Sequence, residues 1–297
     1  MNNQNSEDEI PVIVANATES QSQSQSQSSE PAVSFFLTGF GPFGNVTANP
    51  SSTIMKSLEM EKANGNGNVD LANTHLFKVI RVAKSSVREE VDDTISQLKQ
   101  SLSLDIAEAD GKVDPSLRSR TPCKRKQHAV ILHFGVNHMK MKGQKPMFQL
   151  EQNAFNEANF RIPDEGGDQP KNEPIDPLQP ASHKLSTDLN VKRIRDDLEK
   201  KGFEVKCSGD AGRFLCNYIY WTSLNRVLKE KFGDDDSSSG TETEVHVLFV
   251  HVPQFHDIPE ETQVEFSMEL LGSIKEAILA KGKKRLKKAK GRKEATN

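Results

Sequence analysis

Short apolar runs alternate with longer amphipathic segments along most of the chain, from Val33 to Leu279. The short runs have the length of buried strands, and the longer segments have the apolar spacing typical of helices. We expect strands at 33–38, 75–82, 129–134, 203–207 and 246–252, with another within 148–160. We expect helices at 51–60, 86–102, 188–201, 212–231 and 259–281. This alternation predicts an α/β sheet that is covered by helices on both faces.

The two ends of the chain and two internal segments lack this alternation. Residues 1–31 are acidic and then rich in Gln and Ser, so they bury too little apolar surface to offset the entropy of ordering. We predict that they are disordered. Segments 104–127 and 232–242 are interpreted as surface insertions into a single domain that spans residues 32–280, and residues 281–297 as a basic tail.

Composition limits the classes of protein to which this chain can belong. The formal net charge of −3 does not point to nucleic acid, and no apolar stretch reaches the roughly 18–20 residues of a membrane span. The N-terminus lacks the pattern of a secretory signal. Three cysteines, Cys123, Cys207 and Cys216, without paired spacing argue against a disulfide framework or a zinc site. We therefore expect a reduced, cytoplasmic protein without a membrane partner.

The basic segment 281–293 allows two interpretations. A cluster of Lys and Arg can bind nucleic acid or act as a nuclear-localisation patch. The alternative is the solvated, charged end of a helix, and it is favoured because such clusters are generic.

Cys216 lies early in the predicted helix that follows the strand at 203–207. Asp210 and Gly212 are suitable residues for the start of that helix. Backbone N–H groups and the helix dipole at such a position favour a thiolate over a thiol. Local sequence alone, however, favours a small buried core residue, because free cysteines are often simply buried.

Two histidines and one carboxylate could complete a catalytic group. His251 and His133 each lie at the end of an apolar strand, where sites gather in α/β sheets, and imidazole is a natural base for a thiol. Spacing does not choose between them, and each could be a satisfied core histidine. Glu151 could orient a histidine, although a solvated charge is the simpler interpretation.

The turn at 39–44 combines three glycines with Phe40 and Phe43 directly after the first strand. Glycines let a backbone approach a ligand closely, and aromatic rings can hold a flat group. The spacing is not that of a dinucleotide-binding loop. The alternative is a turn whose phenylalanines cap the core. A long loop, 161–181, is also of the kind that often carries function.

Three blocks in this order, within about residues 33–280, resemble pyroglutamyl peptidase I, the pyrrolidone-carboxylate peptidase family. They are 37–44 (LTGFGPFG) with 49–51 (NPS); 151–156 (EQNAFN) with 161–164 (RIPD), Gly167 and 169–170 (QP); and 210–220 (DAGRFLCNYIY) with 249–253 (FVHVP). Each block alone is moderately specific, and their joint occurrence is highly specific. The resemblance implies that family's fold, a single three-layer α/β/α sandwich with a mostly parallel, mixed central sheet.

The resemblance also implies roles for single residues. Cys216 matches the nucleophile, His251 rather than His133 matches the catalytic histidine, and Glu151 matches the third member of the triad. Arg161 matches an arginine near the developing oxyanion. The two phenylalanines of the turn at 39–44 match the residues that hold the pyroglutamyl ring.

The activity implied is hydrolysis of the amide bond after an N-terminal pyroglutamyl residue, with such peptides as partners and with no metal or organic cofactor. Monomers and homo-oligomers both stay open. One departure is the stretch from Val136 to Pro146, which is longer than the bacterial pattern and has Val136 in place of a glutamine. The alternative is therefore a catalytically silent homologue that only binds ligands or partners.

Overall fold

The computed structural model describes residues 33–44, 46–66, 69–111, 126–137, 145–230, 232 and 242–294. They belong to one compact unit, residues 31–297. The predicted disordered leader, Cys123, most of both predicted insertions and residues 138–144 lie outside the described residues. The predicted domain limits therefore stay predictions.

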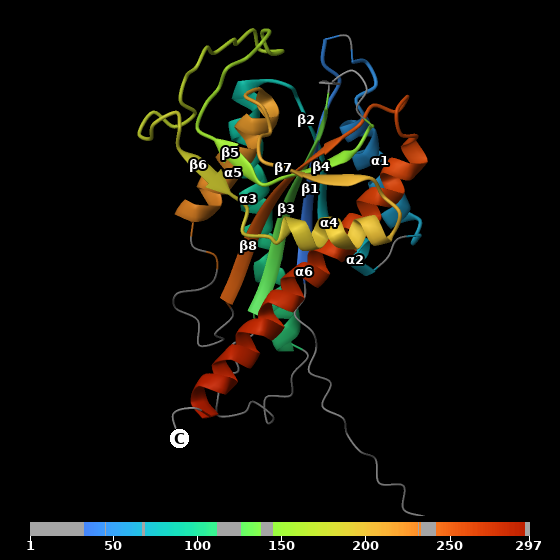
Figure 1. Cartoon of the computed structure of the whole chain (residues 1–297), viewed down its shortest axis with the longest axis vertical. Helices are drawn as coiled ribbons and strands as arrows, with labels where there is room; N and C mark the ends of the chain where they lie inside the picture. The colour runs from blue at the N-terminus through green and yellow to red at the C-terminus, as the bar shows by residue number, and fades with distance from the viewer. Residues whose placement is uncertain are drawn as a thin grey trace, which may run out of the picture. The chain divides into compact units, whose positions relative to one another are not determined.

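Strands and helices alternate as the sequence predicts (Figure 1). The strands are β1 (Val33–Phe40), β2 (Thr74–Ile80), β3 (Lys126–Val136), β4 (Phe148–Glu151), β5 (Asn153–Phe155), β6 (Lys184–Ser186), β7 (Val205–Ser208) and β8 (Glu242–Val252). The helices are α1 (Pro50–Ala63), α2 (Val69–Ala72), α3 (Lys84–Gly111), α4 (Val191–Lys200), α5 (Leu215–Lys229) and α6 (Glu260–Glu294). The short elements α2 and β6 were not predicted, because four or three residues carry too little periodicity to be recognised. The single strand predicted within 148–160 is two strands, β4 and β5.

The central sheet has the strand order β2-β1-β3-β8-β4-β7. Neighbouring strands run parallel at every pairing except that of β4 with β8, which is antiparallel. The predicted mostly parallel, mixed sheet is confirmed. A second, two-stranded antiparallel sheet is formed by β5 and β6.

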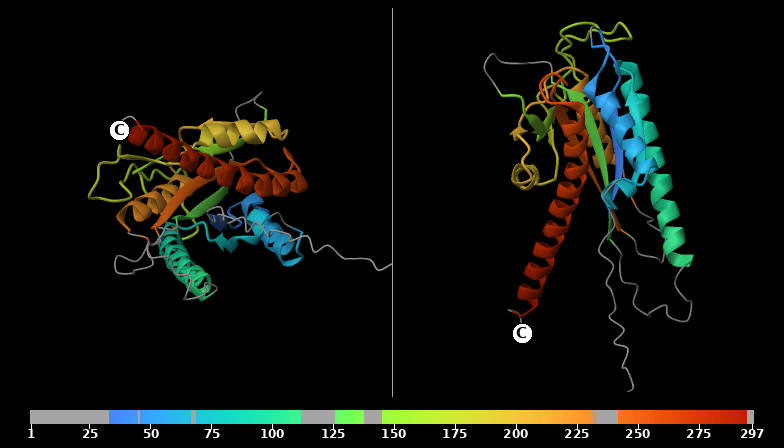
Figure 2. Two further views of the ribbon diagram at one scale, coloured as in Figure 1. Left: turned by 90° about the horizontal axis from the view of Figure 1, so that it is seen from below. Right: turned by 90° about the vertical axis from the view of Figure 1, so that its right-hand side faces the viewer.

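Helices cover both faces of the sheet, which confirms the predicted α/β/α sandwich. On one face, alternate residues of the central strands pack with α1, α4 and α6. On the other face, the intervening residues pack with α3 and α5. The right-hand view of Figure 2 shows α6 and α3 on opposite sides of the strands. Successive side chains of a strand point to opposite faces, so each central strand contributes side chains to both hydrophobic cores.

Two helices extend well beyond their predicted ends. The helix α3 continues to Gly111, into the predicted insertion, and α6 continues to Glu294 through the predicted basic tail. Both extensions are rich in good helix formers such as Ala, Glu, Lys and Arg, which sustain a helix after its apolar face ends. No helix in the described ranges combines the length and apolar composition of a membrane span.

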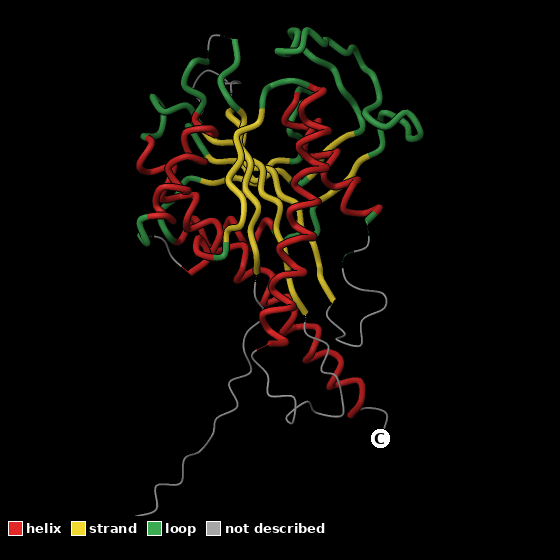
Figure 3. Tube along the Cα trace, turned by 180° about the vertical axis from the view of Figure 1, so that it is seen from behind, coloured by secondary structure: helices red, strands yellow, loops and turns green. Residues whose placement is uncertain are grey.

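Loops gather at one end of the sheet (Figure 3). The loop that follows β1 and the long loop between β5 and β6 both lie there, as Figure 1 shows. The long segment 161–181 has no helix or strand, as predicted. Asp164 anchors it to the start of α3, because its carboxylate accepts a hydrogen bond from the Lys84 amide at 2.6 Å.

Candidate active site

The antiparallel strand β4 brings Glu151 to His251. Glu151 is the last residue of β4 and pairs with Phe249 of β8, two residues before His251. Positions that alternate along paired strands share a face, so the two side chains meet. His251 Nδ1 lies 2.7 Å from Glu151 Oε1. Both side chains are buried, with exposed fractions of 0% for Glu151 and 8% for His251.

Cys216 reaches the same point from the second residue of α5. Its side chain forms a hydrogen bond with His251. Because Glu151 occupies Nδ1 of the imidazole, Nε2 is left for the thiol. The structure therefore brings together the three residues that the resemblance selects, Glu151, Cys216 and His251. Their roles in a reaction are taken up below.

The start of α5 differs from the prediction. The helix begins at Leu215, after Phe214, and not at Gly212. Asp210 does not cap the helix; its carboxylate accepts a hydrogen bond from the Gly212 amide at 2.9 Å. Gly212 has a φ of +83°, a conformation in which glycine avoids a steric penalty. The resulting turn points the chain into α5 three residues later than the sequence suggests.

Charge surrounds the His251 imidazole. Burial alone lowers its pKa, but the Cys216 and Glu151 side chains on either side raise it to about 10. An ordinary histidine has a pKa of 6.5 and is mostly neutral at neutral pH. The site therefore favours a protonated His251 between two groups that can carry negative charge.

The Glu151 carboxylate is enclosed. Its Oε2 atom is buried and has no hydrogen-bond partner among the described residues. Next to it, the Tyr220 hydroxyl donates to the Glu151 backbone oxygen at 2.9 Å and fixes the end of β4. A buried carboxylate interacts strongly with the His251 imidazolium that it faces.

His133 has a different environment from His251. Its Nδ1 lies 2.6 Å from the Thr38 hydroxyl and its Nε2 lies 2.9 Å from the Ser223 hydroxyl. Complete burial lowers the pKa of His133 to about 3, so the ring is neutral. Both ring nitrogens are satisfied by neutral partners, which identifies a structural core histidine.

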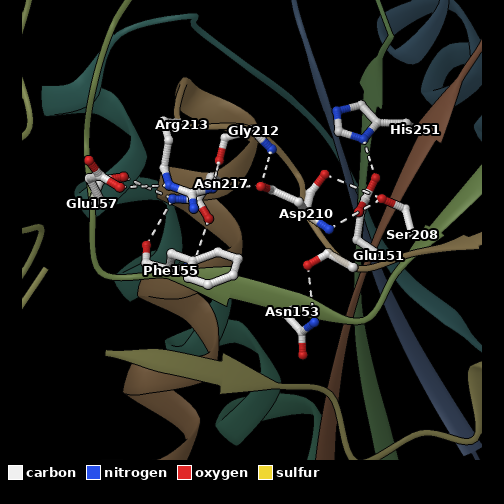
Figure 4. A network of polar contacts seen from close by, with 11 residues as sticks. Glu151, Asn153, Phe155, Glu157, Ser208, Asp210, Gly212, Arg213, Asn217 and His251 are labelled. Carbon is white, nitrogen blue, oxygen red and sulfur yellow. Dashed lines mark hydrogen bonds and ion pairs between the residues drawn. The ribbon is translucent and has the colours of Figure 1, made fainter. Parts of the chain in front are cut away.

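A polar network at the start of α5 holds the neighbouring loop (Figure 4). The Asn217 amide group accepts from the Phe155 amide at 2.8 Å and donates to the Phe155 and Glu157 carbonyls at 2.8 and 3.0 Å. The Arg213 guanidinium donates to Glu157 Oε2 at 2.8 Å and lies 4.1 Å above the Phe155 ring. These contacts fix β5 and its loop against the helix that carries Cys216.

Residues of this network were not singled out from the sequence as functional. A signal was available for Asn217, because asparagine is a poor helix former and its side chain readily bonds to backbone groups. Arg213 offered no such signal, since a charged residue before a helix is usually solvated.

Gly135 allows the close packing around the thiol. A Cβ atom at this position would lie 2.7 Å from Phe249 Cζ and 3.2 Å from Cys216 Sγ. The Phe249 ring in turn contacts the His251 ring at a centroid distance of 4.8 Å. Any side chain at position 135 would therefore displace the groups that hold the thiol and imidazole.

The two phenylalanines of the loop after β1 have different settings. Phe40 is 5% exposed and belongs to the core between the sheet and α3 and α5. Phe43 is half-buried, and its ring lies 5.5 Å from that of Phe214, two residues before Cys216. The Phe214 ring also contacts Phe160 at 4.7 Å. Of the two, Phe43 is the one that lies on an aromatic cluster next to α5.

Arg161 is exposed on the long loop, and its side chain makes no hydrogen bond or ion pair with the residues that the structure describes. Only its backbone oxygen is bonded, by the Gln169 side chain at 3.0 Å. The structure leaves the predicted oxyanion role of Arg161 as a prediction.

Comparisons with known proteins identify the family of the chain. The family model for pyroglutamyl peptidase matches residues 119–267, half of the chain, and that range includes Glu151, Cys216 and His251. The pyrrolidone-carboxylate peptidase of Pyrococcus furiosus is 25% identical over 226 residues, which cover 76% of this chain and 81% of that protein. The corresponding protein of Bacillus amyloliquefaciens is 27% identical over 228 residues, 76% of this chain and 79% of its own.

Solved structures show the same fold. The pyrrolidone carboxyl peptidase from Thermus thermophilus matches with a TM-score of 0.53 at 23% identity, over 80% of this chain and 98% of that one. The enzyme from Thermococcus litoralis matches with a TM-score of 0.57 at 18% identity, over 82% and 94%. With the family model spanning the three clustered side chains, the chain belongs to the pyroglutamyl peptidase family of cysteine peptidases.

Proposed function

We propose that this chain hydrolyses the amide bond that follows an N-terminal pyroglutamyl residue of a peptide, with Cys216, His251 and Glu151 as its catalytic triad. The observation that carries the proposal is the continuous contact from the Cys216 thiol through the His251 imidazole to the buried Glu151 carboxylate. A thiol peptidase needs a histidine in contact with its thiol, because the sulfur must be ionised and the leaving amine must receive a proton.

The first half of the reaction uses the Cys216 sulfur and the His251 proton. The thiolate attacks the carbonyl carbon that follows the lactam ring and forms a tetrahedral intermediate. His251 Nε2 then donates its proton to the leaving amine, and a thioester remains on Cys216. The raised pKa of His251 supports this role, because it keeps the proton on the ring until the amine needs it.

The second half regenerates the enzyme. A water molecule attacks the thioester while the now neutral His251 accepts its proton. Free pyroglutamate is released and the thiolate is restored. Glu151 holds the ring in one orientation through Nδ1 and stabilises its positive charge in both halves.

We assign stabilisation of the oxyanion to backbone amides at the start of α5. The first helical hydrogen bond of α5 runs from the Tyr218 amide to the Phe214 carbonyl at 3.1 Å. The amides of Leu215, Cys216 and Asn217 therefore have no partner within the helix. One such donor is worth about 3–4 kcal/mol in other hydrolases. Arg161 is proposed as a further donor, as in the family pattern.

The substrate ring carries no charge, and the proposed binding residues suit it. Pyroglutamate lacks the ammonium group of an ordinary N-terminus, so its site needs no carboxylate to pair with that charge. We assign the ring to Phe43 and Phe40, and Phe214 next to Phe43 enlarges the aromatic surface.

The activity test compares three fluorogenic amides: pyroglutamyl, prolyl and glutaminyl aminomethylcoumarin. Proline lacks the lactam oxygen and glutamine lacks the ring, and both carry an α-ammonium group. The proposal expects turnover of the pyroglutamyl compound, at least about 100-fold above the other two, since unpaired charge and lost hydrogen bonds are costly to bury. No turnover of any compound by reduced protein would favour the catalytically silent homologue.

The nucleophile is tested by Cys216→Ala, with Cys207→Ala as the matched control. The Cys207 thiol is half-buried on β7, and burial raises its pKa, so it is a poor nucleophile. We expect Cys216→Ala to abolish hydrolysis and Cys207→Ala to keep it. Iodoacetamide should label Cys216 and inactivate the enzyme, and a pyroglutamyl analogue should protect it. Normal turnover by Cys216→Ala would refute the assignment.

The proposed Arg161 donor is tested by Arg161→Ala. A transition-state donor predicts a kcat lowered by about 10²–10³-fold with little change in KM. A kcat within about twofold of the parent would assign the oxyanion to the α5 amides alone.

A further inference from the structure

A second cluster of buried and half-buried polar side chains lies on the other face and at the other end of the sheet. His128 is near the start of β3, and Glu244 and His246 are near the start of β8. The register pairs His128 with Glu244, and Val130 with His246. All three side chains therefore share the face that packs with α1, α4 and α6, whereas Cys216 lies on the opposite face.

The ligand atoms of these residues converge. His128 Nδ1 lies 3.2 Å from His246 Nε2, and the two rings are stacked at a centroid distance of 5.4 Å. Glu244 Oε2 lies 3.7 Å from His128 Nδ1. One atom from each of the three residues lies within 4.8 Å of the others. Zinc–nitrogen bonds of 2.0–2.1 Å in a tetrahedron separate two nitrogens by about 3.3 Å, close to the spacing present.

Neighbouring charges orient the ligands. Asp188 Oδ1 lies 2.8 Å from His246 Nδ1, so this nitrogen carries the proton and Nε2 presents its lone pair to the cluster. Lys281 holds the other oxygen of Asp188 at 3.0 Å. Lys126 donates to Glu244 Oε1 at 2.6 Å, and Glu244 Oε2 lies on the side of His128 Nδ1. A carboxylate behind a histidine is the usual second layer of a zinc site.

A hydrogen bond between the two imidazoles is the competing explanation. It needs a proton on His128 Nδ1, donated to His246 Nε2. Binding of a cation needs that proton on His128 Nε2 instead, which is a change of tautomer with no net gain or loss of a proton. The convergence of a Glu244 carboxylate oxygen with the two ring nitrogens favours the cation, which all three ligand atoms can bind together.

We propose that His128, His246 and Glu244 bind one Zn²⁺ ion, with water at the fourth position and Asp188 orienting His246. Two imidazoles and one carboxylate are ligands that zinc prefers. The cysteine spacing, which argues against a zinc site, does not bear on histidine ligands. The ion joins the starts of β3 and β8, so its role is structural. It does not depend on the proposed peptidase activity.

The test titrates the full chain with zinc chloride by calorimetry and with Co²⁺ by visible absorption. The background is Cys207→Ser with Cys216→Ser, because the thiol beside His251 could itself bind zinc. We expect one equivalent to bind, with the intense visible bands of tetrahedral Co²⁺. Replacing either ligand, in His128→Gln or His246→Gln, should abolish both signals. Asp188→Asn should weaken binding by about 10–100-fold.

Two further variants keep the test decisive. Glu244→Gln replaces a half-buried side chain without changing its shape, so it should fold, as judged by circular dichroism, and bind zinc at least about tenfold more weakly. His256→Gln is the matched control, because His256 is 72% exposed outside the cluster. Zinc should raise the Tm of the parent and of His256→Gln, and it should leave the Tm of His128→Gln and His246→Gln unchanged. The proposal is overturned if the parent binds no zinc, or if folded His246→Gln or Glu244→Gln binds it as tightly as the parent.

Discussion

His251 and His133 lie on neighbouring strands and point to the same face of the sheet, yet the protein treats them in opposite ways. In the register of β3 with β8, His133 pairs with Phe249, and His251 pairs with Gly135. Both rings are buried. The pKa of His251 is raised to about 10, whereas burial lowers the pKa of His133 to about 3.

The partners explain the difference. His133 contacts two hydroxyl groups, which satisfy a neutral ring but do not stabilise a charged one. His251 contacts a carboxylate and a thiol, both of which can carry negative charge. Position at the end of an apolar strand therefore does not identify a catalytic histidine; the charge of its neighbours does.

The largest expected effect separates the two histidines. His251→Gln should lower kcat/KM by about 10⁴-fold or more, because it removes the proton carrier of the proposed mechanism. His133→Gln should keep kcat/KM within about tenfold but lower the free energy of unfolding by about 1–3 kcal/mol, since a buried hydrogen bond is disturbed. Steady-state kinetics and urea unfolding measure the two effects. Equal kinetic losses in both variants would contradict the comparison.

The next largest effect is expected from a substitution that removes the negative charge beside His251 and keeps the shape of the side chain. Glu151→Gln should lower kcat/KM by about 10²–10⁴-fold, because the imidazolium loses its buried counter-ion. The matched control is Glu157→Gln, in which the carboxylate faces Arg213 and not His251. It should change kcat/KM by less than about tenfold. If Glu151→Gln is as active as Glu157→Gln, the buried carboxylate has no catalytic role.

A smaller effect concerns the packing that positions the thiol. Gly135→Ala places a Cβ atom against Phe249 and Cys216, and we expect it to cost about 1–3 kcal/mol of stability and to lower kcat about tenfold. Gly209→Ala is the control, because its Cβ atom would meet only the Asn153 side chain at 3.6 Å. Thermal unfolding and kinetics of the pair decide the point. Wild-type behaviour of Gly135→Ala would show that the site tolerates displacement of the sulfur.

The smallest effect is the pH dependence of stability. The folded pKa of His251 is above its ordinary 6.5, so its contribution is complete below pH 6.5 and declines as the pH rises toward 10. The folded pKa of His133 is below 6.5, so its contribution is present above pH 6.5 and declines as the pH falls toward 3. Urea unfolding across this pH range gives the free energy of unfolding of the parent, of His251→Gln and of His133→Gln. The difference between parent and variant should fall with rising pH for His251 and rise with pH for His133. Stability differences that change with pH in the same direction for both histidines would contradict the assigned charges.

Much of the fold follows from periodicity, and the site follows from the family resemblance. The alternation of strands and helices correctly predicts the sandwich, because each element carries its own apolar pattern. The local sequence of Cys216, by contrast, favours a plain core residue. Its contact with His251 joins α5 to β8, and the pairing of β4 with β8 brings Glu151 to His251, 100 residues away in the sequence. No local pattern records such a pairing.

The same limit applies elsewhere. The His128–His246 contact spans 118 residues and joins two strands whose register is set by the whole sheet. The lengths of α3 and α6 were underestimated because helix propensity continues after the apolar face ends. Sequence patterns therefore predict the elements better than the side-chain contacts between them.

The most direct measurement is the protonation state of His251 by NMR of ¹³C,¹⁵N-histidine-labelled protein, with the signal assigned through His251→Gln. The account predicts that His251 is still an imidazolium at about pH 7.5, where His133 is neutral. It also predicts that Cys216→Ala lowers the pKa of His251, because the sulfur is the strongest of the groups that raise it. A neutral His251 at that pH, or a pKa that does not respond to Cys216→Ala, would contradict the ion pair on which the proposed mechanism rests.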